Sequence, residues 1–157
     1  MKIQWKKLLI CLAIPLGVGV LAGLITRDSM ETFAALTKPP LSPPGWLFPV
    51  VWTILYLLMG LASYLVLTAD SSKRKINAAL QVYGWQLGAN FIWPLLFFSA
   101  EAYLPAFLWL LLLWALIAVT LYRFAHIRAA AGWLLVPYLA WVTFAGYLNL
   151  GIYLLNR

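Results

Sequence analysis

Apolar residues fill five long windows of this chain, and the charged residues lie between them. The windows cover residues 8–26, 39–69, 76–100, 102–122 and 129–156. Each can hold an α-helix of about 20 residues, the length that crosses the hydrocarbon core of a bilayer. The pattern therefore predicts an all-α integral membrane protein, a five-transmembrane-helix bundle, with helices near residues 8–26, 46–69, 76–99, 103–123 and 132–155.

Composition agrees with this interpretation. Of the 157 residues, 65% are hydrophobic and 10% are charged, whereas soluble domains have about 25% charged residues. The connections between the predicted helices are short, so residues 1–157 are expected to form a single membrane domain. The connection over residues 27–45 is longer, and ordered loops of this length often cover a binding site. Its prolines disfavour helix, which predicts a stiff extended arm over residues 39–44.

Three lysines, Lys2, Lys6 and Lys7, precede the first apolar window, as they would in a secretory signal peptide. That window is as long as a spanning helix and has no small-x-small cleavage site before Thr26, which favours a membrane helix. The lone Cys11 lies within it and is expected to be a small buried hydrophobic residue.

Five helices place the two termini on opposite sides of the membrane, and the basic residues divide unequally between those sides. Of the 11 lysines and arginines, eight lie on the side of the N-terminus: Lys2, Lys6, Lys7, Lys73, Arg74, Lys75, Arg123 and Arg128. Arg27, Lys38 and Arg157 lie on the other side. Because cytoplasmic loops carry the excess of basic residues, the division predicts a cytoplasmic N-terminus and an outer C-terminus. It also explains the net charge of +7 without a nucleic-acid-binding surface.

Residues able to carry acid, base or metal chemistry are few. The only histidine, His126, falls in a predicted connection, as do all the acidic residues: Asp28, Glu31, Asp70 and Glu101. No spacing is typical of a metal site, a catalytic triad or a phosphate-binding loop. No ionisable residue lies within a predicted helix core, where ion-coupled transporters keep theirs. We therefore expect no metal, no cofactor and no driven pump.

Uncharged polar and aromatic residues recur at helical spacing along three predicted helices. The stripes are Pro49, Trp52 and Tyr56; Gln86, Asn90, Trp93 and Phe97; and Tyr138, Trp141, Ala145 and Asn149. A buried amide in hydrocarbon is costly unless it is hydrogen-bonded, so the stripes should face the interior of the bundle. They either hold the helices together or line a pocket for a large, flat, mostly apolar ligand.

Gly84 and Gly88 have the Gly-x-x-x-Gly spacing that lets two membrane helices approach closely. They lie on a face of the third helix that is offset from Gln86 and Asn90. The spacing predicts a homodimer through this helix, with the pocket on its other side.

Three ordered motifs span the chain. They are Lys38, Pro39, Pro43, Pro44, Gly45, Trp46, Phe48, Trp52, Leu55 and Tyr56; then Asn90, Trp93, Phe97 and Phe98; then Pro137, Tyr138, Trp141, Phe144, Ala145, Leu148 and Asn149. With five helices and matching loop lengths, the chain resembles the TspO/MBR family, the translocator proteins once called peripheral benzodiazepine receptors. It departs from many members at Thr32 and Phe33, where they carry a Trp-Tyr pair.

The resemblance implies a commonly dimeric five-helix bundle whose pocket binds porphyrins and synthetic benzodiazepine-type ligands, and cholesterol in animal members. The first loop would close this pocket as a lid, with Lys38, Pro39, Pro43 and Pro44. Trp52 and Trp141 would be the two pocket tryptophans, a pair linked in some bacterial members to light-dependent porphyrin breakdown. Together with the stripes, the expected ligand-binding residues are Trp52, Tyr56, Gln86, Asn90, Trp93, Phe97, Tyr138, Trp141, Ala145, Leu148 and Asn149.

These expectations favour a bacterial cell-membrane protein that binds porphyrin and acts in its sensing, sequestration or transfer. A passive transporter of porphyrin or sterol-like lipid needs the same pocket, as does a light-dependent porphyrin-degrading enzyme with Trp52 and Trp141 as catalytic residues. A structural protein with an incidental pocket is a further alternative. Leu150, Tyr153 and Arg157 fit a proposed cholesterol-binding pattern, which is a weak indicator.

Overall fold

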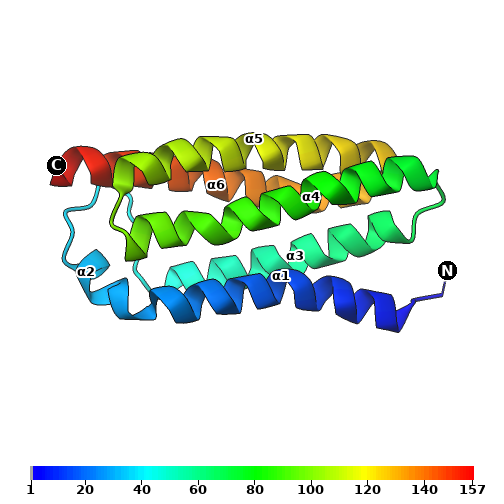
Figure 1. Cartoon of the computed structure of the whole chain (residues 1–157), viewed down its shortest axis with the longest axis horizontal. Coiled ribbons are helices and arrows are strands. Elements are labelled where there is room, and N and C mark those ends of the chain that lie inside the picture. The colour runs from blue at the N-terminus through cyan, green and yellow to red at the C-terminus, as the bar shows by residue number, and fades with distance from the viewer. Residues whose placement is uncertain (1) are drawn as a thin grey trace.

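A computed structural model describes residues 2–157 of the chain. Five long helices form an elongated bundle (Figure 1): α1 (Trp5–Thr26), α3 (Leu47–Leu67), α4 (Lys73–Pro94), α5 (Tyr103–Ile127) and α6 (Ala129–Asn156). A 3-10 turn, η1 (Arg27–Ser29), and a short helix, α2 (Met30–Ala34), follow α1, and a π-helical turn, η2 (Leu95–Ser99), follows α4. Residues 2–157 contain no strand, so the predicted all-α class is confirmed.

The long helices follow one another around a ring. α1 packs on α3, α3 on α6, α6 on α5 and α5 on α4, whereas α1 and α4 close the ring loosely. The two termini lie at opposite ends of the bundle (Figure 1), as five traversals require. α2 lies at the end that also holds the C-terminus. The loose contact between α1 and α4 leaves internal space in the bundle.

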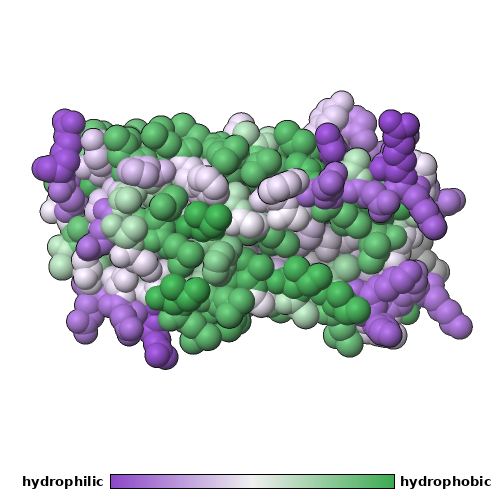
Figure 2. Space-filling model, in the orientation of Figure 1, coloured by the Kyte–Doolittle hydropathy of each residue, from purple (hydrophilic) through white to green (hydrophobic). Residues whose placement is uncertain are grey.

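Four of the long helices are long and apolar enough to cross a membrane: α1 with its extension to Ala34, α3, α5 and α6. α4 is less apolar, because three basic residues open it and Gln81, Gln86 and Asn90 interrupt it. Apolar side chains cover the middle of the molecule, and hydrophilic ones gather at its two ends (Figure 2). This banding is the surface that a bilayer requires of the helices it surrounds.

The predicted connection between the fourth and fifth long helices is almost entirely helical, which corrects the expected bounds. α5 continues to Ile127 and α6 begins at Ala129, so only Arg128, with φ −153° and ψ 117°, breaks the helix. His126 is therefore an exposed residue in the last turn of α5. The apolar window ends at the first charged residue, but the helix continues because its backbone hydrogen bonds do not depend on side-chain hydropathy.

Gly60 allows α1 and α3 to pack with their backbones in contact. A Cβ atom at this position would lie 2.7 Å from the carbonyl oxygen of Cys11 and 2.8 Å from Cα of Leu12. Small residues at helix contacts are the usual means of close packing in membranes. Cys11 is buried in this contact and forms no disulfide, as expected.

We predict that Gly60→Ala destabilises the bundle, because the atoms that the new methyl group would meet belong largely to the backbone and cannot move aside. Overpacking of this kind costs about 1–3 kcal/mol. Gly17→Ala is the matched control, since a Cβ there meets nothing within 4 Å. Thermal unfolding in detergent should show a lower Tm for Gly60→Ala than for Gly17→Ala. Equal melting temperatures would contradict the close contact at Gly60.

Candidate ligand-binding site

A cavity of about 840 Å³ lies inside the bundle at the end where α2 is found. Its lining comes from α1, η1, α2, the connection to α3, the first half of α3, the end of α4 with η2, and α6 from Trp141 onward. α5 does not contribute. The volume falls within the range of about 300–1,000 Å³ that is typical of small-molecule sites.

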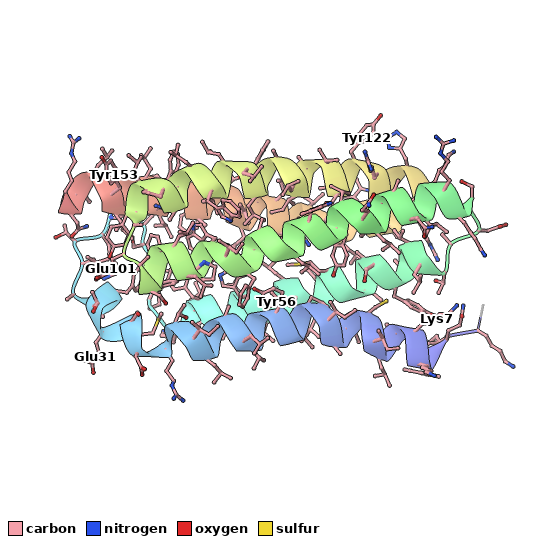
Figure 3. The ribbon with its side chains drawn as sticks, viewed as in Figure 1. Lys7, Glu31, Tyr56, Glu101, Tyr122 and Tyr153 are labelled. Carbon is pink, nitrogen blue, oxygen red and sulfur yellow. The ribbon has the colours of Figure 1, made fainter. Side chains whose placement is uncertain are left out.

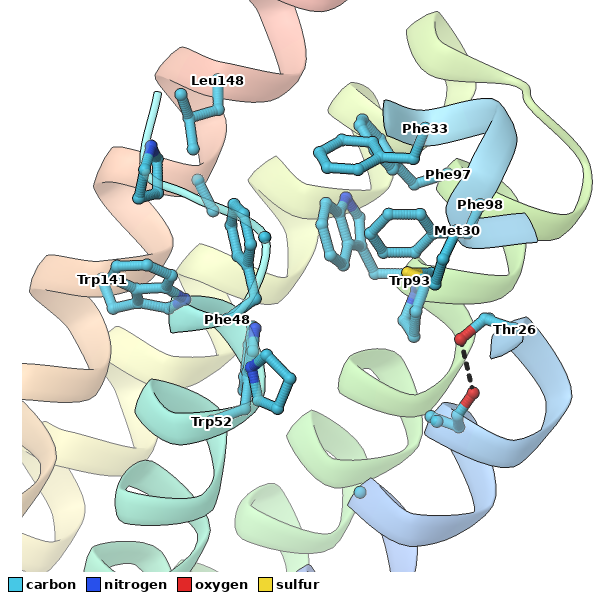
Figure 4. Close-up of a pocket in the computed structure, with 18 of the residues that line it drawn as sticks. Thr26, Met30, Phe33, Phe48, Trp52, Trp93, Phe97, Phe98, Trp141 and Leu148 are labelled. Atoms are coloured by element: carbon cyan, nitrogen blue, oxygen red, sulfur yellow. Dashed lines mark hydrogen bonds between the residues drawn. The ribbon is translucent and has the colours of Figure 1, made fainter. Parts of the chain in front are cut away.

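Two groups of aromatic side chains face each other across the cavity (Figure 4). One group, from α3 and α6, is Phe48, Trp52 and Trp141; the other, from α2, α4 and η2, is Phe33, Trp93, Phe97 and Phe98. In the second group, the rings of Trp93 and Phe97 stack with their centroids 5.1 Å apart. The groups meet at one edge, where the centroids of Phe33 and Phe48 are 6.0 Å apart. The cavity is therefore a slot with two aromatic walls.

Pro94 helps to shape the second wall. It has no backbone N–H, so the regular hydrogen-bond ladder of α4 cannot continue through it and gives way to the π turn η2. At the end of this turn the amide of Ala100 donates to the carbonyl of Leu95 at 2.9 Å, five residues back. Phe97 and Phe98 project from this turn onto the cavity, and Pro94 itself is part of the lining.

A chain of four polar side chains closes the cavity at its inner end. The Tyr56 hydroxyl donates to Asn90 Oδ1 (2.8 Å), and Asn90 Nδ2 donates to the Tyr138 hydroxyl (2.6 Å). The Tyr138 hydroxyl in turn donates to Gln86 Oε1 (2.6 Å). Tyr56 and Asn90 line the cavity, so their polar atoms form its floor.

Two residues expected to bind the ligand, Gln86 and Tyr138, do not line the cavity. Both are buried, with 1% exposure each, behind the floor. Gln86 shares a face of α4 with Asn90, but it lies one turn farther from η2, where the helices are in contact rather than apart. The structure therefore assigns these two residues to the support of the floor, which corrects their predicted position.

The other expected residues all line the cavity: Trp52, Tyr56, Asn90, Trp93, Phe97, Trp141, Ala145, Leu148 and Asn149. Some also hold the helices together. Trp93 Nε1 donates to Asn149 Oδ1 (3.0 Å), and Asn149 Nδ2 donates to the Tyr103 carbonyl (2.8 Å), which joins α4, α5 and α6. Trp141 differs, because its buried Nε1–H has no acceptor. The stripe residues therefore do both of the things that the sequence allowed: they hold the helices together and they line a pocket.

Residues 35–46 run along the mouth of the cavity and are fastened to α6. Asn156 accepts a hydrogen bond from the Thr37 amide (3.0 Å) and donates one to the Thr37 carbonyl (2.7 Å). The Tyr147 hydroxyl donates to the Pro40 carbonyl (2.7 Å). Gly151 leaves room for Pro39, since a Cβ at position 151 would lie 2.7 Å from Pro39 Cγ.

Three of the four predicted lid residues line the cavity, namely Lys38, Pro43 and Pro44. Pro39 instead is buried against Gly151. The arm over residues 39–44 is not uniformly extended, because it turns at Leu41, whose φ of 70° is left-handed. The prolines keep the arm out of α3, as expected, but its contacts with α6 determine its path.

Several lining residues carry no signal in the sequence. Gly19, Val20 and Gly23 come from α1, which has no polar or aromatic stripe, and Met30 and Phe33 come from the segment predicted as loop. Of these residues, only Phe33 could have been suspected from the sequence, because it is an aromatic residue within a predicted connection. The lining contains no His, Cys, Asp or Glu, and residues 2–157 hold no cluster of three or more such side chains. The site can stack, donate hydrogen bonds and attract negative charge.

We predict that Tyr138→Phe destabilises the protein although Tyr138 does not line the cavity. The change removes the partner of Asn90 Nδ2 and of Gln86 Oε1, and a buried unsatisfied polar group costs about 1–3 kcal/mol. Tyr122→Phe is the control, since this phenol is 64% exposed. Thermal unfolding in detergent should separate the two variants. A Tyr138→Phe protein as stable as Tyr122→Phe would show that the chain does not hold the floor.

The comparisons with known proteins agree with this arrangement. The model of the TspO/MBR family matches residues 11–155. Tryptophan-rich protein TspO of Chlorobaculum tepidum is 38% identical, over 98% of this chain and 98% of its own length. Tryptophan-rich sensory protein of Cereibacter sphaeroides is 35% identical, over 99% and 95%. Translocator protein of Homo sapiens is 36% identical, over 88% and 82%. Because these matches cover nearly every element that lines the cavity, the chain belongs to the TspO/MBR family of integral membrane proteins.

Proposed function

We propose that the protein binds porphyrins or similar tetrapyrroles in this cavity, and acts in their sensing, sequestration or transfer. The observation that carries the proposal is the pair of aromatic walls on opposite sides of the cavity. A flat macrocycle between them would stack on both, and aromatic pairs contribute about 0.5–1.5 kcal/mol each beyond the area that they bury. The polar floor of Tyr56 and Asn90 offers hydrogen bonds at the edge of the ring.

The names of two relatives support a role beyond binding. The Cereibacter sphaeroides relative is called a sensory protein and the Homo sapiens relative a translocator protein. A sensor needs a bound state that differs from the free one, and residues 35–46, which line the mouth of the cavity, are the segment that a ligand would contact first. We place this protein with the bacterial relatives as a sensor or carrier of porphyrin.

We also propose that α4 is the fifth transmembrane helix of the bundle. Its central polar residues, Gln86 and Asn90, are buried and hydrogen-bonded to other helices, so they do not meet lipid. The basic residues at positions 73–75 lie at the end of the bundle opposite α2. With this end in the cytoplasm of a bacterial cell, the mouth of the cavity and the C-terminus lie on the outer side.

Passive transport of porphyrin or a sterol-like lipid is a second candidate function. Val20 lines the cavity and is nevertheless 61% exposed, and Pro49 and Thr53 on the neighbouring α3 are also exposed. An opening on this side would let an apolar ligand exchange with the bilayer. Synthetic benzodiazepine-site ligands and sterols are large and mostly apolar, so they would occupy the same space.

We further propose that two copies of the chain associate through α4. Gly84 and Gly88 are exposed, and a Cβ on either would meet nothing within 4 Å. On the same face, Trp85 is 69% exposed and Gln81 is exposed. A second helix on this face would cover the exposed amide and pack against both glycines.

The binding proposal predicts that Trp52→Leu with Trp141→Leu weakens binding of protoporphyrin IX by about tenfold or more, since two stacking contacts are lost. The control is Trp5→Leu with Trp133→Leu, which removes two exposed tryptophans outside the cavity. Titration followed by porphyrin absorbance avoids the change in protein fluorescence. Equal affinity in both double variants would overturn the assignment of the pocket.

The same proteins separate the alternatives. In liposomes, transport predicts faster porphyrin entry with the parent chain than with the Trp52/Trp141 double variant, and binding alone predicts no difference. Light-dependent breakdown predicts a new absorbing product upon illumination that the double variant does not form.

The dimer proposal predicts that Gly84→Leu with Gly88→Leu converts a dimer into a monomer, because leucine side chains keep the two helices apart. Light scattering of the detergent-solubilised protein gives the mass. Gly17→Leu is the control, because this position on α1 lies outside the cavity lining and a Cβ there also meets nothing within 4 Å. A double α4 variant that stays dimeric would exclude this interface.

A further inference from the structure

The charged residues that follow α1 are sorted by sign around the cavity. Four of them lie between residues 27 and 38: Arg27, Asp28, Glu31 and Lys38. The two basic residues line the cavity and the two acidic residues do not. Glu31 projects away from the bundle (Figure 3). One short segment thus places its positive charge on the cavity and its negative charge elsewhere.

Lys38 is held at the cavity without an anionic partner. Its Nζ donates to the carbonyls of Ala34 (3.0 Å) and Leu36 (3.3 Å) and lies 5.0 Å from the ring centroid of Phe33. These contacts use two of its three N–H groups and leave one for a ligand. The side chain is half-buried, and it forms no ion pair with a residue that the structure describes. A partly buried ammonium group beside an apolar cavity is a site for an anion.

Arg27 adds a second positive charge to the same lining. It begins η1 directly after Thr26, its side chain is exposed, and no described residue forms an ion pair with it. The guanidinium group is suited to carboxylates, because it presents several donors in a fixed plane. Since the lining contains no Asp or Glu, neither cation is neutralised within the site.

The cavity therefore has three chemically distinct regions: aromatic walls, an uncharged polar floor and a cationic rim. We infer that its ligand is an anionic amphiphile that carries carboxylate groups along one edge, with this edge at Lys38 and Arg27 and the apolar body between the aromatic walls. The inference rests on the proposed function. A porphyrin with two propionate groups on one side of its macrocycle has this chemistry, and it would enter with its ring toward Tyr56 and Asn90.

The test compares protoporphyrin IX with its dimethyl ester, which keeps the flat ring and removes both negative charges. At low salt, the parent protein in a neutral detergent is expected to bind the acid about tenfold more tightly than the ester, because a hydrogen bond to a charged group contributes about 1.5–3 kcal/mol. Added salt should reduce this preference, since the rim is partly exposed. A parent protein that binds both porphyrins equally would overturn the inference and leave the proposed function intact.

Variants assign the preference to the rim. Lys38→Met keeps the length of the side chain and should remove most of the preference by weakening the acid alone, whereas Lys38→Arg should keep it. Arg27→Gln should also reduce the preference, independently of Lys38. Lys75→Met is the control, because this exposed lysine lies at the opposite end of the bundle. Unchanged preference in both Lys38→Met and Arg27→Gln would overturn the inference, and failure of both porphyrins to bind the parent would overturn the proposed function as well.

Discussion

The hydrogen-bond chain from Tyr56 through Asn90 and Tyr138 to Gln86 is the interaction on which the rest of the structure depends. It joins α3, α4 and α6 through four buried side chains, and a buried polar group without a partner is costly. Each member satisfies its neighbour, so the three helices are held in one register. The chain also separates a packed half of the bundle from a half that contains a cavity.

The two halves differ in the residues at the helix contacts. In the packed half, Gly60 brings the backbones of α1 and α3 together. In the other half, large rings stand between the helices, and Pro94 with the π turn η2 widens the end of α4. The rings pack in pairs along each wall, which leaves the space between the walls unfilled. A ligand that stacks on both walls would fill this space and make contacts with rings that have no protein neighbour on that side.

The mouth of the cavity is controlled by contacts that are distant in sequence. Asn156 and Gly151 of α6 hold Thr37 and Pro39, and this fixes where the neighbouring Lys38 lies. Phe33, in the preceding helix α2, lies on the second wall. One short stretch of chain thus brings both an aromatic ring, Phe33, and a positive charge, Lys38, to the cavity.

The sequence by itself determined the helical class, the membrane character and several aromatic and polar residues of the cavity lining, because hydropathy and helical period directly decide which residues a helix can bury. The family followed from the three ordered motifs. Trp52, Asn90 and Trp141 follow from their stripes. It did not separate Gln86 from Asn90, or detect Gly19 and Phe33. A stripe indicates which face of a helix is polar. It does not indicate the depth along the helix at which the neighbouring helix comes into contact with that face. Only the tertiary structure decided that depth, because it depends on backbone approach, on the π turn and on the anchoring of residues 35–46 to α6.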